Sequence, residues 1–233
     1  MFTNIILQVQ EGASAIVQTS SEIVQTEKTM NIIDLAVKGG WIMIVLAILS
    51  IIAVYIFVDR YLALNKAAKD DKNFINNIKT FIHKGDLEGA KSLTKSNNTP
   101  IGRMLDKGLS RIGRPLNDIN QAVENVGKLE IARLENGVSM VGTIAALGPS
   151  LGFLGTVTGM VRAFFDMAAA GNNIDIQVLS GGIYEAMITT VGGLIVGIIC
   201  NFLYSILVSK INKIVFLLEA RTMEFMDLLH EPA

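Results

Sequence analysis

The chain has 233 residues, of which 51% are hydrophobic and only 18% are charged, and its mean hydropathy is +0.47. This composition is too apolar for an ordinary soluble domain and too charged for a chain that lies wholly in lipid, so we expect one part in a membrane and another in water. The formal net charge is −1, but 14 of the 20 Lys and Arg residues fall between positions 60 and 133, so the isoelectric point alone does not indicate the partners.

The first predicted membrane helix follows an N-terminal segment, residues 1–39, in which Gln, Ser and Thr dominate and whose role the sequence leaves open. We predict this transmembrane helix over 40–59, because 41–58 holds 18 consecutive residues without a charge. As a helix this stretch would span about 27 Å, which matches the hydrocarbon core of a bilayer.

Residues 60–135 are predicted to form a helical domain in water, because apolar residues recur in it at helical spacing. With Asn117 or Asp118 as its cap, a last helix should run without a break into the next membrane span. Basic and acidic residues are interspersed throughout this domain, which indicates a solvated surface and no nucleic-acid partner.

Two further transmembrane helices are predicted over 136–168 and 176–208, joined by a hairpin loop over 169–175. A C-terminal helix over 209–233 should extend the third span, so the fold class is an all-α membrane protein with long helical extensions. Basic residues follow the first and third spans and are missing from the hairpin loop. The positive-inside rule therefore places the N-terminus in the periplasm and the C-terminus in the cytoplasm.

Small residues recur along one side of the second and third spans, and such stripes let membrane helices approach closely. Hairpin packing alone is a sufficient explanation for them. The glycines concerned are Gly148, Gly152, Gly155 and Gly159 in the second span and Gly182, Gly192, Gly193 and Gly197 in the third.

Glu185 lies on the third span, where a carboxylate costs on the order of 2.5 kcal/mol or more and by default indicates a functional site. It could exchange protons, or it could be a structural carboxyl bonded to Thr156, to Thr189 or to a neighbouring subunit. Arg162 and Asp166, four residues apart, are expected to pair with each other instead. A stripe on each of two helices cannot enclose a pathway, so we expect a symmetric ring with the first span outside against lipid.

No cofactor, metal site or catalytic machinery is predicted. The single cysteine, Cys200, lies in an apolar run, and no Cys/His spacing typical of a metal site occurs. His83 and His230 lie in polar stretches without a serine or acidic partner arrangement, so we expect no enzyme.

The segments 146–160 and 179–197 contain the patterns GxxGTVxGM and GIxEAxxTTxxGL, in order, on consecutive spans. In this combination the chain resembles the MotA/TolQ/ExbB proton-channel family, and its ExbB branch most closely. Three spans, a periplasmic N-terminus and a large cytoplasmic region also resemble that branch, whereas the MotA branch has four spans.

The resemblance implies a pentamer that encloses two single-span partners of ExbD type and uses the proton-motive force of the bacterial inner membrane to drive a TonB-type protein in outer-membrane import. It implies that Glu185, Thr156 and Thr190 line the proton pathway. Thr190 lies about 140° around an ideal helix from Glu185, so either the helix is not ideal there or Thr190 faces an adjacent subunit. Thr189 beside it is a further candidate. A TolQ-like role in envelope maintenance and a non-conducting membrane scaffold remain alternatives.

Overall fold

The computed structural model describes residues 39–68, 72–170 and 176–230, and all regular secondary structure in these ranges is α-helical. The predicted all-α class is confirmed for this part of the chain. Residues 1–38 of the predicted N-terminal segment, 171–175 of the predicted hairpin loop and the last three residues of the predicted C-terminal helix lie outside the described residues. The helices are α3 (Gly40–Ala67), α4 (Lys72–His83), α5 (Leu87–Ser96), α6 (Pro100–Leu109), α7 (Leu116–Glu135), α8 (Val138–Ala169) and α9 (Ile176–His230).

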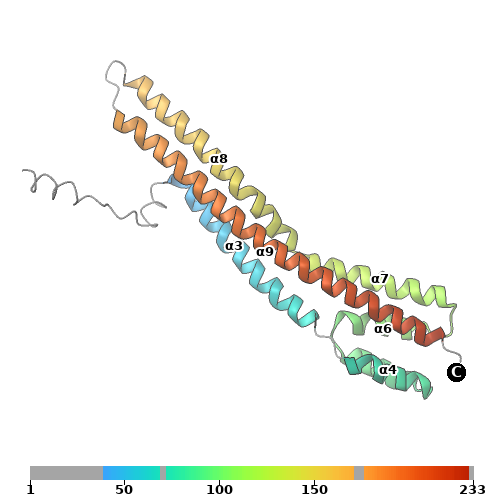
Figure 1. The fold of residues 1–233 in the computed structure, drawn as a ribbon. Helices are drawn as coiled ribbons and strands as arrows, with labels where there is room; N and C mark the ends of the chain where they lie inside the picture. Colours follow the sequence, from blue (N-terminus) through green and yellow to red (C-terminus); the bar gives the residue numbers. More distant parts are fainter. Residues whose placement is uncertain (1–38, 69–71, 171–175, 231–233) are drawn as a thin grey trace, which may run out of the picture. The chain divides into compact units, whose positions relative to one another are not determined.

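Three stretches of helix are long and apolar enough to cross a membrane: α3, the stretch that includes α8, and α9. The prediction of three membrane-spanning helices is therefore confirmed by length and composition. Helices α8 and α9 lie side by side along their apolar parts, and α3 packs against both (Figure 1). Many apolar side chains on these helices stay exposed, Tyr55, Phe165 and Ile198 among them, as expected where lipid or another subunit covers the surface.

The passage from α7 to α8 is broken, so the prediction of one unbroken helix into the second span is wrong. Helix α7 ends at Glu135, Gly137 adopts a left-handed conformation with φ 80°, and α8 starts at Val138. Only glycine takes this conformation at no steric cost, and it is the usual way to end a helix. The N-cap of α7 is Pro115, two residues earlier than the earliest predicted cap.

Helix α9 runs for 55 residues without interruption, which agrees with the predicted extension of the third span. Its second half carries the core of the helical part outside the predicted membrane spans, because its buried face packs against α3, α6 and α7. The buried residues of this core include Leu64, Leu105, Leu109, Val123, Leu207, Ile211, Ile214, Leu218 and Phe225.

The short helices α5 and α6 start at local signals. The Asp86 carboxylate accepts a hydrogen bond from the Gly89 N–H at 2.9 Å and so caps α5. The Thr99 hydroxyl accepts one from the Gly102 N–H at 3.3 Å, with Pro100 in the first turn of α6. Both arrangements satisfy backbone N–H groups that a helix start leaves unpaired.

Candidate functional site

The contact between α8 and α9 is made of backbone against backbone at its centre. A β-carbon on Gly148 would lie 2.9 Å from the carbonyl oxygen of Gly193 and 3.0 Å from the nitrogen of Gly197. A β-carbon on Gly193 would lie 2.5 Å from the carbonyl oxygen of Gly148 and 2.8 Å from the Cα of Gly152. No side chain fits at these positions, so glycine sets the separation of the two helices.

Towards the hairpin loop the same seam continues with slightly larger residues. Gly155 faces the side chain of Thr189, which is 1% exposed and donates a hydrogen bond to the Ala186 carbonyl at 2.8 Å. Gly159 faces Ala186, and a β-carbon there would lie 3.1 Å from the alanine methyl. Gly182 in turn faces Ala163. Thr189 is therefore part of the buried seam in this chain.

Thr190 links the two helices through a hydrogen bond. Its hydroxyl donates to the backbone carbonyl of Gly152 at 3.1 Å, from α9 to α8. The sequence left two explanations for its angle to Glu185: a distorted helix or an adjacent subunit. The structure shows a third arrangement, in which Thr190 faces the other helix of its own hairpin.

Glu185 is turned away from this seam and towards the start of α3. Its Oε1 atom lies where a side chain at Gly40 would begin, because a β-carbon built there would be 2.5 Å from it. On the same side of α9, a β-carbon at Gly192 would lie 2.9 Å from the Sδ atom of Met43. The small residues of the third span were expected to form one stripe, but some of them face α3, as Gly192 does, and others face α8, as Gly193 does.

Thr156 is not joined to Glu185 within the described part of the chain. Its hydroxyl donates to the Phe153 carbonyl at 2.6 Å, within α8. No hydrogen bond between described residues connects Glu185 to Thr156 or to Thr189, so a structural bond of the carboxyl to either hydroxyl is not seen. The Glu185 side chain is half-buried.

Arg162 and Asp166 were expected to pair, and that prediction is wrong. Both side chains are exposed, and the ion pairs among the described residues do not include this one. A pair on one helix surface is worth only a few tenths of a kcal/mol, too little to hold two exposed side chains in one geometry.

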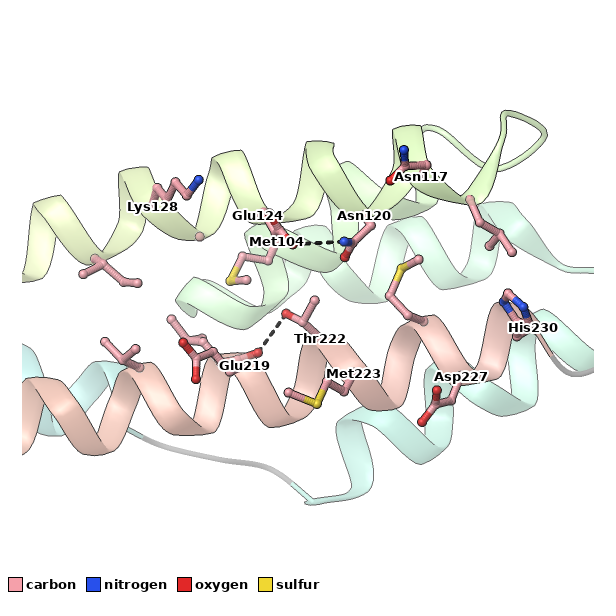
Figure 2. A pocket seen from close by; sticks show the side chains of 16 residues that line it. Met104, Asn117, Asn120, Glu124, Lys128, Glu219, Thr222, Met223, Asp227 and His230 are labelled. Atoms are coloured by element: carbon pink, nitrogen blue, oxygen red, sulfur yellow. Dashed lines mark hydrogen bonds between the residues drawn. The ribbon is translucent and has the colours of Figure 1, made fainter.

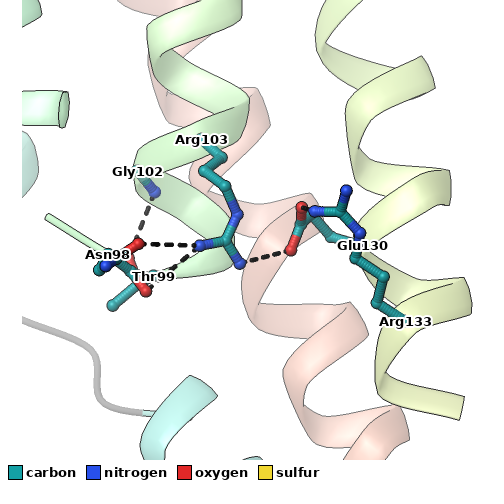
Figure 3. Close-up of polar contacts among 6 residues, drawn as sticks. All are labelled: Asn98, Thr99, Gly102, Arg103, Glu130 and Arg133. Atoms are coloured by element: carbon teal, nitrogen blue, oxygen red, sulfur yellow. Dashed lines mark hydrogen bonds and ion pairs between the residues drawn. The ribbon is translucent and has the colours of Figure 1, made fainter. Parts of the chain in front are cut away.

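An ionic network between α6 and α7 was not predicted. The Glu130 carboxylate, on a residue that is 3% exposed, accepts from Arg103 of α6 at 2.5 Å and from Arg133 at 2.7 Å (Figure 3). The hydrogen bond from Arg103 holds the pKa of Glu130 below its ordinary value, against the opposing effect of burial. Arg103 also donates to the backbone carbonyl of Asn98, so one side chain connects α7 with the turn before α6.

A cavity of about 730 Å³ lies between α7 and α9, far along the chain from Glu185 (Figure 2). Its walls combine apolar residues such as Met104 and Met223 with the acidic Glu124, Glu219 and Asp227. Its lining residues fall outside the predicted spans 136–168 and 176–208. Among the described residues, no group of three His, Cys, Asp or Glu side chains could hold a metal ion.

The sequence of the chain is similar to those of known proteins. A family model described as the MotA/TolQ/ExbB proton channel family matches residues 96–220. A putative biopolymer transport protein ExbB-like 1 from Synechocystis is 28% identical over 184 residues, which cover 78% of this chain and 72% of the relative. A putative biopolymer transport protein ExbB homolog from Methanothermobacter thermautotrophicus is 32% identical over 55% of this chain and 44% of its own. The Tol-Pal system protein TolQ of Haemophilus influenzae is 26% identical over 79% of this chain and 87% of its own.

Proposed function

Because the chain belongs to the MotA/TolQ/ExbB proton channel family, we propose that it is the ring-forming subunit of an ExbB-like motor driven by the proton-motive force. In this proposal five copies surround a pair of ExbD-type single-span partners in the bacterial inner membrane, with the N-terminus periplasmic and the C-terminus cytoplasmic. Proton passage near Glu185 moves the partners, which energise a TonB-type protein for outer-membrane import.

The observation that carries the proposal is an acidic side chain on a membrane helix that makes no ion pair among the described residues. Glu185 is half-buried on α9, and none of the described salt bridges includes it. Ionisable residues in such positions persist where they line a cavity or carry ions. A half-buried carboxyl on the otherwise uncharged stretch 176–208 therefore supports a role in proton transfer.

The exposed apolar faces support the assembly part of the proposal. Ile51, Phe165 and Ile198 are each more than two-thirds exposed in the single chain, on three different membrane helices. Lipid can cover one such face, but a pathway beside Glu185 needs further protein around it. A ring of identical chains with a partner inside supplies that protein, and Thr156 and Thr190 are proposed to border the pathway.

The test is proton flux in liposomes that contain this chain together with the ExbD-type partner. Glu185→Gln keeps the shape of the side chain and should abolish flux, while the assembled complex keeps the mass of the wild type in native mass spectrometry. Asp166→Asn, at an exposed acidic residue of α8, is the matched control and should conduct normally. Flux that persists in Glu185→Gln contradicts the proposed pathway, and a complex that no longer assembles supports a structural role in a scaffold.

A TolQ-like motor for envelope maintenance is the second candidate, because the TolQ relative is matched over 87% of its length. The two roles share the site and differ in the partner. Complementation of strains that lack one or the other system separates them: restored import supports the ExbB-like role, and restored envelope integrity supports the TolQ-like role.

A further inference from the structure

The beginning of α3 lies against the Glu185 carboxyl of α9. A β-carbon on Gly40 would be 2.5 Å from Oε1 and 3.6 Å from Cδ of Glu185. Gly40 has a φ of +67°, a conformation that residues with a side chain rarely adopt. The absence of a side chain at this position therefore leaves the space that the carboxyl fills.

The first turn of α3 has no acidic group of its own. Its N-cap is Gly39, which makes no side-chain hydrogen bond to the helix, and its first turn contains no Asp or Glu. The first N–H groups of any helix lack partners within the helix, and the partial positive charge at that end favours a nearby carboxylate. Glu185, from another helix, brings a carboxylate to this end.

Two neighbouring contacts fix the register between the two helices. A β-carbon on Gly39 would lie 3.2 Å from Cγ2 of Ile188, and one on Gly192 would lie 2.9 Å from the sulfur of Met43. Residues 185, 188 and 192 of α9 follow each other at helical spacing, so they form one face. The carboxyl is therefore held at the end of a packed contact between α3 and α9.

We propose that the first turn of α3 is a positioning element for Glu185, and that Gly40 is required there because any side chain would displace the carboxyl. The functional consequence rests on the proposed function: α3 sets where the proton-exchanging group is found when no partner contacts it. The first span then acts directly on the pathway, in addition to packing on the outside of the other two.

The test measures the position of the carboxyl without measuring proton flux. The purified chain in detergent is treated with a hydrophobic carbodiimide, and the labelling rate of Glu185 is followed by mass spectrometry. In Gly40→Ala the rate should rise about two- to fivefold, the factor that corresponds to losing one interaction with a helix terminus. Gly181→Ala, one turn before Glu185 on α9, is the control, since a β-carbon there meets nothing within 4 Å, and it should label at the wild-type rate.

A second variant covers the case in which Gly40→Ala does not fold. Trp41→Asp places an acid in the first turn of α3, at a residue that is 64% exposed, where it stabilises the start of the helix and competes with Glu185 for the same partial positive charge. Labelling of Glu185 should rise in this variant too. In a Glu185→Asp background the shorter carboxyl does not reach Gly40, so adding Gly40→Ala should leave labelling at position 185 unchanged.

The positioning inference is overturned if Gly40→Ala and Gly181→Ala change the labelling rate equally, or if the effect of Gly40→Ala persists in the Glu185→Asp background. Either result means that the effect does not depend on the contact of Gly40 with Glu185. Labelling that behaves as expected in a protein without proton flux upholds the positioning role and contradicts the proposed function, so the two failures are distinguishable.

Discussion

Gly192 and Gly193 are adjacent in α9 but face different helices, and an alanine at each tests how the hairpin is held together. A β-carbon on Gly193 would lie 2.5 Å from the Gly148 carbonyl oxygen, a backbone atom that no side-chain rotation can move. A β-carbon on Gly192 would meet the sulfur of Met43 at 2.9 Å, and this flexible side chain can turn aside.

The magnitude follows from these distances. Ordinary contact begins near 3.4 Å, so Gly193→Ala forces α8 and α9 apart by about 0.9 Å, and overpacking of this kind costs about 1–3 kcal/mol. Both variants gain the same helix propensity, which cancels when they are compared. At about 2–4 °C per kcal/mol for a chain of this size, Gly193→Ala should melt about 2–12 °C below Gly192→Ala.

The assay uses the single cysteine of the chain. Cys200 is 2% exposed on α9, so a thiol-reactive dye should report its exposure as the purified protein unfolds in detergent on heating. Equal melting temperatures for Gly192→Ala and Gly193→Ala would refute the reasoning, because they would mean that the backbone contact of α8 with α9 does not limit their separation.

Two further changes test the ion pair of Glu130 and the turn at Gly137. Glu130→Gln should destabilise the chain by about 1–3 kcal/mol at neutral pH, because Arg103 loses a charged partner. The folded-state pKa of Glu130 is lowered, so this stabilisation is complete above the unfolded value near 4.3 and is lost as the pH falls through the lower folded value. The difference in melting temperature between wild type and Glu130→Gln should therefore be present at neutral pH and disappear at acidic pH. Glu135→Gln, at an exposed residue, is the unaffected control. A difference that stays constant with pH contradicts the ion pair. Gly137→Ala should lower the free energy of unfolding by about 1–2 kcal/mol, because alanine is strained in the left-handed conformation of Gly137. Gly137→Asn should lower it less, because asparagine adopts this conformation more readily. Equal losses in the two variants, measured by the same melting assay, contradict the strain.

The number and place of the membrane helices followed from the sequence because hydropathy and length suffice to identify them. The family also followed, since its glycine and threonine patterns stand on consecutive spans. The break at Gly137 did not, although Asn136-Gly137 is a common helix end, because the apolar run after it masked the signal. Helical periodicity describes which residues share one face of a helix, and it does not show where a residue with positive φ ends that helix.

The neighbours of the site residues were beyond the sequence. Glu185 faces α3, whereas Thr190 faces α8. This difference depends on how the three helices pack and cannot be read from the sequence pattern of α9 alone. The burial of Glu130 could have been found, because it continues the apolar spacing of Ile119, Val123 and Val126. An acid in an apolar register indicates a buried ion pair, but its partner Arg103 lies on another helix.

The unbroken course of α9 has a mechanical consequence. At 1.5 Å per residue its 55 residues extend for about 80 Å, from Ile176 to His230. A displacement of one end of α9 would be carried along the whole helix, because its course is continuous. Beside it, the helix is divided at Gly137 into α7 and α8, so a displacement near Glu185 would reach the far end of the described chain through α9 and not through its neighbour.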